Sequence, residues 1–261
     1  MTQKYDDFSA RMKEYEKVNT TYLTKRMPIL IRVDGKAFHT YTKGMEKPFD
    51  KDLASAMQET AKYLCKTMTG CKLAYTQSDE ITLLLINYNP FKFGTETYYN
   101  NNKTKIETIA ASKATVGFNQ VMSKLYPEKE WAEFDARAWT IPKEEVANAF
   151  IWRQLDATKN SIAMVAQAHF HQNKLNNLNG KQLQEKLWQE KQINWSKLPI
   201  WQKRGVAIIK KEIVKQGQTP DGKATQSIRR KWDVDWNTPE FTKDREYIEK
   251  YVYPEKQVVS F

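Results

Sequence analysis

Two stretches of the sequence decide the fold: PILIRVDG at residues 28–35 and KLAYTQSDEITLLLINY at residues 72–88. The first is a short apolar run that ends in a carboxylate and a glycine, which predicts a buried strand over residues 28–34. The second holds two apolar runs, Lys72 to Thr76 and Glu80 to Tyr88, with only three residues between them. So short a connection predicts a tight hairpin of two antiparallel strands.

Helical periodicity lies on either side of the predicted hairpin. From Asp50, a plausible N-cap, to Met68, apolar residues recur at a spacing of three to four, and Lys105 to Leu125 repeats this pattern. Phe134 to Thr140 reads as a fourth strand, and Glu144 to about Gln172 as mainly helical. The order up to Thr140 is therefore βαββαβ. It predicts an α+β, ferredoxin-like fold: an antiparallel sheet with helices packed on one face, as in the palm of nucleotide polymerases and cyclases.

Composition narrows the class of protein. The 261 residues contain no window of about 20 nearly uncharged apolar residues, so we expect no membrane span. The first seven residues have no apolar signal core, and the chain has just two cysteines, Cys65 and Cys71. A domain of this size cannot be held together by one disulfide, so the sequence favours a reducing, cytoplasmic setting.

The net charge of +11 is concentrated near the C-terminus. Between Lys174 and Lys231 there are 14 basic residues against 4 acidic ones, with Trp188, Trp195 and Trp201 interleaved. Such a segment suits a polynucleotide, because cations displace condensed counterions and flat rings stack on bases. A solvated helix face with tryptophans in its own core explains the pattern equally well. We predict two regions: a palm-like domain over residues 1–172, and a basic, Trp-rich region over residues 173–261 that packs on the palm.

Acidic residues follow two of the predicted strands. Asp34 and Gly35 end the first strand, and Asp79 and Glu80 lie in the hairpin. In a split βαβ sheet these positions should converge at one edge, where paired carboxylates suit Mg²⁺ and two ions suit phosphoryl transfer. Gly35 allows close backbone approach, and the amides of residues 36–39 could cradle a triphosphate. Taken singly, an Asp-Gly is more often a turn and a Ser-Asp-Glu a cap.

The motifs around these acids resemble the tRNA(His) guanylyltransferase family. The residues that carry the resemblance are IRVDGKAFH (31–39), KPFD (47–50), YTQSDE (75–80), SK (112–113), FDAR (134–137) and RQLD (153–156). Family members are 3′–5′ nucleotide-adding polymerases with a polymerase-like palm. They add a nucleotide to the 5′ end of tRNA, using ATP to activate that end when it carries a monophosphate.

The resemblance implies roles for individual residues. Asp34, the Gly35 carbonyl and Asp79 match the ligands of two Mg²⁺ ions, and Glu80 matches an acidic neighbour important for activity. The nucleotide-binding positions that match are Asp34, Gly35, Lys36, Ala37, Phe38, His39, Lys47, Ser78, Asp79 and Lys113. Residues expected to bind tRNA, by motif or by charge, are Arg153, Asn160, Lys203, Arg204, Arg229, Arg230 and Lys231. GTP or another NTP is the expected substrate, and a homotetramer is the expected assembly.

The sequence departs from the eukaryotic members at one motif. Residues 158–164 read TKNSIAM where eukaryotic members have His-Ile-Asn-Asn-Leu-Tyr-Asn, which they use in selecting tRNA(His). In this respect the chain looks like the bacterial and archaeal branch, which prefers templated addition and repairs 5′-truncated tRNA. The expected activity is therefore template-dependent 5′-end repair, with addition of a G₋₁ nucleotide to tRNA(His) as a further possibility.

Two other classes of protein remain open on the sequence. A palm-fold nucleotide cyclase would need no polynucleotide, but the hairpin lacks the Gly-Gly-Asp/Glu-Glu-Phe sequence usual in cyclases. A non-catalytic RNA-binding module would explain the basic region. It would leave the paired acids unexplained, since they repel RNA unless metal ions neutralise them.

Overall fold

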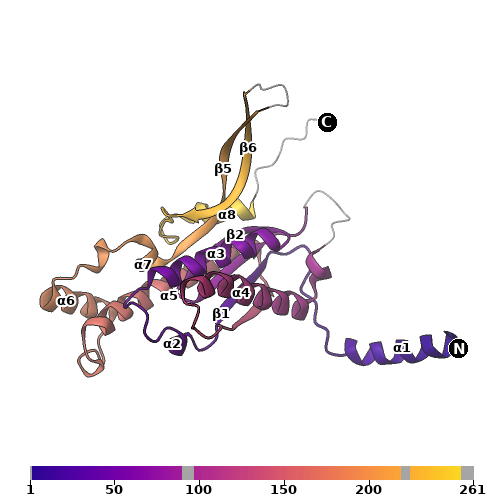
Figure 1. Ribbon diagram of the computed structural model, residues 1–261, viewed down its shortest axis with the longest axis horizontal. Helices are drawn as coiled ribbons and strands as arrows, with labels where there is room; N and C mark the ends of the chain where they lie inside the picture. The colour runs from indigo at the N-terminus through magenta and orange to yellow at the C-terminus, as the bar shows by residue number, and fades with distance from the viewer. Residues whose placement is uncertain (1, 90–96, 219–223, 254–261) are drawn as a thin grey trace.

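The sheet confirms the predicted antiparallel palm and extends it. The computed structural model describes residues 2–89, 97–218 and 224–253. These form one antiparallel six-stranded sheet in the order β4-β1-β3-β2-β5-β6 (Figure 1). The four palm strands lie within a few residues of their predicted positions: β1 Ile29–Gly35, β2 Cys71–Gln77, β3 Glu80–Leu85 and β4 Phe134–Thr140.

The two predicted palm helices, α3 (Lys51–Thr67) and α4 (Lys103–Leu125), cover one face of this sheet. Asp50 caps α3 as expected, because its Oδ1 accepts a hydrogen bond of 2.9 Å from the amide of Leu53. The inward side chains of β1 on this face belong to the same core as the apolar stripes of both helices; they are Ile29, Ile31 and Val33.

The opposite face of the sheet is also covered, which the sequence did not predict. Helix α5 (Lys143–His169) and helix α8 (Glu246–Val252) bury Leu30, Tyr75 and Leu84 beneath Phe150 and Ile248. Strands covered on both faces need apolar side chains on both, which explains the unbroken run of three leucines at the end of β3. Helix α5 therefore lies across the sheet as a second layer.

The C-terminal region is more regular than its sequence indicates. It contains α6 (Gly180–Lys191), α7 (Ile200–Arg204), β5 (Val206–Gln218) and β6 (Ala224–Asp235). Only the first three residues of β5 pair with β2. Farther along, β5 and β6 pair with each other alone and project from the body as a two-stranded ribbon, here called the arm (Figure 1).

The remaining elements are short or peripheral. Helix α1 (Thr2–Lys17) extends away from the body, and α2 (Phe38–Tyr41) follows β1 directly (Figure 1). Three single 3₁₀ turns lie at residues 98–101, 172–174 and 195–197. No helix in the described ranges is sufficiently long and apolar to cross a membrane.

We predict that Gly35→Ala destabilises the turn that leads out of β1. An added Cβ would lie 2.3 Å from the ring of Phe38, and that ring is held between Tyr41, Phe118 and Phe134 with centroids 5.0–5.5 Å away. Because the ring has no free direction to move, the substitution should cost about 1–3 kcal/mol of unfolding free energy, measured by denaturant titration.

Gly180→Ala is the matched control. The nearest atom to its added Cβ is 3.8 Å away, and Gly180 begins a helix, so we expect a neutral or slightly stabilising effect. Equal stability of Gly35→Ala and the wild type would show that the Phe38 ring does not confine this position.

Candidate functional site

The structure brings Asp34 and Asp79 together at one edge of the sheet. Asp34 lies opposite Glu80 in the β1–β3 pairing and opposite Asp135 in the β1–β4 pairing. Asp79 belongs to the two-residue loop between β2 and β3, and its carbonyl accepts a hydrogen bond of 3.1 Å from the amide of Gly35. This bond joins the end of β1 to the hairpin.

The electrostatics of Asp34 reflect this convergence. Burial raises the pKa of Asp34, and the negative charge of Asp79 raises it further, while the guanidinium of Arg32 opposes both effects. Across the described residues, neither Asp34 nor Asp79 forms an ion pair. Two carboxylates that converge without a cation between them fit the oxygen ligands of Mg²⁺.

The donor set is nevertheless small. Within the described part of the chain, no three His, Cys, Asp or Glu side chains are placed to hold a metal ion. Asp34, Asp79 and the carbonyl of Gly35 are only three ligand groups, and Mg²⁺ commonly completes its sphere with water and substrate phosphates. The residues present therefore fit a metal that is bound together with a nucleotide.

A cavity of about 540 Å³ opens beside these acids. Asp34, Ser78 and Asp79 form one end, and α5 forms one wall. An apolar part is contributed by Phe49 and Trp201, whose rings meet edge to face with centroids 6.1 Å apart. A volume of this size suits a single small ligand such as a nucleotide. The aromatic part was missed by the sequence analysis, since Phe49 and Trp201 are distant in the chain and no motif links them.

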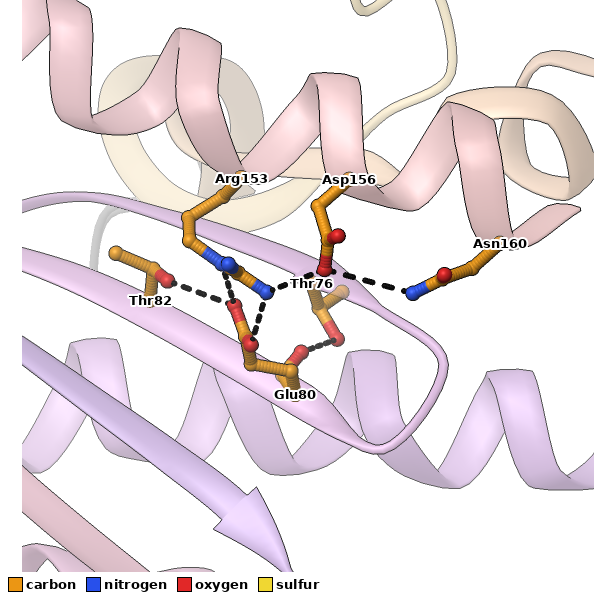
Figure 2. A network of polar contacts seen from close by, with 6 residues as sticks. All are labelled: Thr76, Glu80, Thr82, Arg153, Asp156 and Asn160. Atoms are coloured by element: carbon orange, nitrogen blue, oxygen red, sulfur yellow. Dashed lines mark hydrogen bonds and ion pairs between the residues drawn. The ribbon is translucent and has the colours of Figure 1, made fainter. Parts of the chain in front are cut away.

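Glu80 and Arg153 both line the cavity, and they form a buried ion pair (Figure 2). The guanidinium donates from Nε to Oε1 at 2.7 Å and from Nη2 to Oε2 at 2.6 Å, and the two side chains are only 8% and 9% exposed. Thr82 donates to Oε1 of Glu80, and Asp156 accepts from Nη2 of Arg153 at 3.0 Å. Burial raises the pKa of Glu80, although Arg153 opposes this effect.

These contacts give both residues a structural part beside the roles predicted for them. The sequence placed Glu80 among the catalytic acids and Arg153 among the residues that bind tRNA. In the structure the carboxylate of Glu80 binds the guanidinium of Arg153, so the pair joins the hairpin to α5. No short-range pattern indicates this contact, because it spans two elements that are far apart in the chain.

The loop after β1 is only partly directed toward the cavity. Ala37 adopts a left-handed backbone with φ of +54°, and Phe38 is buried in the core. Lys36 forms an exposed ion pair with Glu133, and His39 is exposed on α2. None of these four side chains lines the cavity, so any contact with a nucleotide there would come from their backbone amides or from movement of Lys36.

The two other predicted phosphate-binding lysines lie apart from the cavity lining. Lys47 is exposed and precedes Pro48, which does line the cavity. Lys113 donates from Nζ to the carbonyl of Thr67 at 2.9 Å, and partial burial lowers its pKa. The structure therefore shows Lys113 bound to the last turn of α3.

The residues expected to bind tRNA fall into two groups. Asn160 and Arg204 line the cavity, where Arg204 also pairs with Glu240 at 3.1 Å, and Lys203 donates to the carbonyl of Ser196. The second group is exposed on β6 in the arm and consists of Arg229, Arg230 and Lys231; of these, Arg230 pairs with Glu212.

Comparison with known proteins now identifies the family. The family model described as tRNAHis guanylyltransferase matches residues 9–142, about half of the chain. The chain belongs to the tRNAHis guanylyltransferase family.

Solved structures agree with this assignment. A bacterial tRNA(His) guanylyltransferase-like protein in complex with ATP is 50% identical, with a TM-score of 0.84, and the match covers 94% of this chain and 99% of that one. A bacterial tRNA(His) guanylyltransferase-like protein in complex with GTP is 46% identical over the same shares, with a TM-score of 0.77. An uncharacterised protein of Acanthamoeba polyphaga mimivirus is 30% identical over 241 residues, covering 84% of this chain and 82% of its own length. Membership makes this guanylyltransferase-family chain a nucleotidyltransferase that acts at the 5′ end of tRNA.

We predict that Arg153→Ala strongly destabilises this guanylyltransferase-family chain. Removing Arg153 leaves the Glu80 carboxylate buried without its partner, which should cost about 3–5 kcal/mol in denaturant unfolding. Loss of the guanidinium also raises the pKa of Glu80 further, so the cost should shrink as the pH falls and Glu80 takes up a proton.

Arg230→Ala provides the control for that variant. Its ion pair with Glu212 is 70% and 57% exposed, so the loss should stay within about 1 kcal/mol. Similar losses for the two arginine variants would show that burial does not strengthen the Glu80–Arg153 contact.

We predict that Asp34→Asn stabilises the fold while removing activity. Because the pKa of Asp34 is raised in the folded chain, its ionised carboxylate opposes folding at neutral pH. The amide does not ionise, so the Tm without divalent cations should rise by about 1–3 °C at pH 7. The gain should vanish at a pH low enough to protonate Asp34 in both folded and unfolded chains.

Asp6→Asn removes an exposed charge on α1 and should leave the Tm nearly unchanged. A Tm for Asp34→Asn at or below that of the wild type at pH 7 would contradict the electrostatic argument.

Proposed function

We propose that this chain repairs the 5′ end of truncated tRNA by template-dependent 3′–5′ nucleotide addition. The observation that carries the proposal is the convergence of Asp34 and Asp79 in the lining of a cavity of nucleotide size. The similar structures contain ATP in one case and GTP in the other, which supports nucleoside triphosphates as substrates and ATP as the activator of a 5′-monophosphate.

The proposed reaction transfers a nucleotide without a covalent enzyme intermediate. The 3′-hydroxyl of the incoming NTP attacks the α-phosphorus of the 5′-triphosphate or adenylylated tRNA end. A new phosphodiester forms, pyrophosphate or AMP leaves, and the hydroxyl proton passes to solvent. The described site residues include no Ser–His or Cys–His pair, and none is required.

The residues of the chain hold and orient these reactants. Asp34, Asp79 and the carbonyl of Gly35 would hold two Mg²⁺ ions, which when bound lower the pKa of the attacking hydroxyl and neutralise phosphate charge. The hydrogen bond from Gly35 to Asp79 keeps these ligands in register. Phe49 and Trp201 offer an apolar surface to the nucleobase, and α5 shields that side from water.

The basic C-terminal region is proposed to bind the body of tRNA. Arg229, Arg230 and Lys231 are exposed on an arm that projects beyond the sheet, where a large polyanion can reach them (Figure 1). Lys203 and Arg204, between the arm and the cavity, would contact the part of the RNA nearer its end. By family resemblance, the working assembly is a homotetramer.

We predict that Asp79→Ala abolishes nucleotide addition and leaves tRNA binding largely intact. The variant removes one of two carboxylates that would hold the metal, whereas the exposed cations of the arm are unchanged. The measurement is incorporation of labelled NTPs into a panel of tRNAs that lack one 5′ nucleotide, with tRNA binding followed in parallel.

The same panel tests the substrate. It should include tRNA(His) with and without a nucleotide at position 73 that pairs with the added G. Addition that follows Watson–Crick pairing across many truncated tRNAs supports repair, whereas activity confined to G₋₁ addition on tRNA(His) rejects it. Full activity of purified Asp79→Ala would sink the proposed site.

A further inference from the structure

An exposed tryptophan, Trp152, lies outside the lining of the cavity. Trp152 directly precedes Arg153 on α5, and 54% of its surface is open to solvent, although its neighbour is buried. The guanidinium of Arg153 lies 4.5 Å from the centroid of the indole ring, and that of Arg32 lies 6.0 Å from it. Because Glu80 and Asp156 hold Arg153 in place, the indole is presented from a fixed point.

Two arginines pair with each other on the sheet, and one of them, Arg32, adjoins this tryptophan. Arg32 lies two residues before Asp34 on the same face of β1, and it pairs directly across the strands with Arg137 on β4. Both guanidinium groups act on Asp34, since each lowers its pKa. Neither arginine forms an ion pair with any residue in the described ranges. Two adjacent cations without carboxylate partners favour an anionic ligand.

Trp152, Arg32 and Arg137 thus form an open shelf beside Asp34, here called the Trp152 shelf. Its arginines match the charge of phosphates, and its indole offers a flat, rigid surface. Four tryptophans are exposed in the described part of the chain, and of these only Trp152 has guanidinium groups against its ring. Among these exposed tryptophans, Trp152 therefore stands out by combining an open ring with adjacent cations.

We propose that the Trp152 shelf binds the terminal nucleotide at the 5′ end of the RNA substrate, with the terminal base stacked on the indole. The inference rests on the proposed function, and it assigns the binding site of the second substrate, the 5′ end of the RNA. Addition at a 5′ end requires two reactants on either side of the metal ligands. The cavity suits the single NTP. None of the three shelf residues lines it, although Arg32 lies only two residues from Asp34, which does.

The open shape of the shelf favours RNA over a free nucleotide. Arg137 and Asp135 are exposed on β4, the edge strand of the sheet, so the shelf is open to solvent along this strand. A duplex end can rest on such a surface and continue into solvent. Stacking on an aromatic ring is tolerant of base identity, as an enzyme that acts on the ends of several RNAs would need.

The test uses an RNA acceptor-stem hairpin with 2-aminopurine as its 5′-terminal base. This base analogue loses fluorescence when it stacks. We expect the wild type to quench it on binding, Trp152→Ala to lose the quenching, and Trp152→Phe to keep most of it. In steady-state addition, Trp152→Ala should raise the KM for RNA about tenfold or more and leave the KM for the NTP unchanged.

Two further variants separate stacking from other effects. Arg137→Ala should weaken RNA binding and reduce its salt dependence by about one unit of log–log slope, with quenching in the bound state retained. Trp236→Ala is the control, because it removes an equally exposed indole after β6, at the opposite edge of the sheet from β4. It should behave as the wild type in every assay.

The outcomes distinguish failure of the Trp152 shelf from failure of the proposed repair reaction. Quenching by Trp152→Ala as strong as by the wild type, or a raised KM for the NTP alone, overturns the shelf as the RNA seat and leaves the proposed function standing. A wild-type protein that quenches through Trp152 but adds no nucleotide to any tRNA supports the shelf and overturns the proposed reaction. Absence of RNA binding by the wild type overturns both.

Discussion

The contact on which the site depends is the buried ion pair of Glu80 and Arg153. Either charge would be strongly destabilising if it were buried without its partner, so each side chain fixes the position of the other. Glu80 is the first residue after the β2–β3 loop, and Arg153 lies within the longest helix, so the pair holds helix α5 against the hairpin (Figure 2). The part of α5 that lines the cavity and the neighbouring Trp152 are therefore both positioned by this contact.

The second constraint is also electrostatic, but it destabilises the fold, whereas the ion pair positions helix α5. The fold brings Asp34 and Asp79 together although their charges repel, and it buries Asp34 in part, which makes its ionised form less favourable still. A protein that folded for stability alone would separate these acids or place a lysine between them. Binding of the proposed divalent cation would recover this cost, since a ligand that binds only the folded chain stabilises that chain.

The parts of the fold that were predictable from sequence are those set by local pattern. The periodicity of α3 and α4, the Asp50 cap and the short β2–β3 connection are all visible within a few residues. Given those elements, a split βαβ topology requires that the end of β1 meet the hairpin, so the approach of Asp34 to Asp79 follows from order alone.

What escaped prediction depends on contacts between distant segments. The Glu80–Arg153 pair, the Phe49–Trp201 contact and the addition of β5 to β2 each join elements that no local pattern relates. The contact of Lys113 also joins two helices that no local pattern relates: its amino group donates to the carbonyl of Thr67 at the end of α3. Its predicted part in nucleotide binding stays a prediction.

The arm has a consequence for how copies of this chain behave in solution. Beyond its three pairs with β2, strand β5 presents an edge of unsatisfied backbone groups, and Val214 and Ile228 are exposed on the ribbon. Such an edge invites another strand to add to it and so favours aggregation. The basic clusters on the two strands, Lys210-Lys211 and Arg229-Arg230-Lys231, counter this tendency, because two arms that approached edge to edge would bring like charges together. The same charges that suit a polyanion therefore also keep the protein colloidally stable.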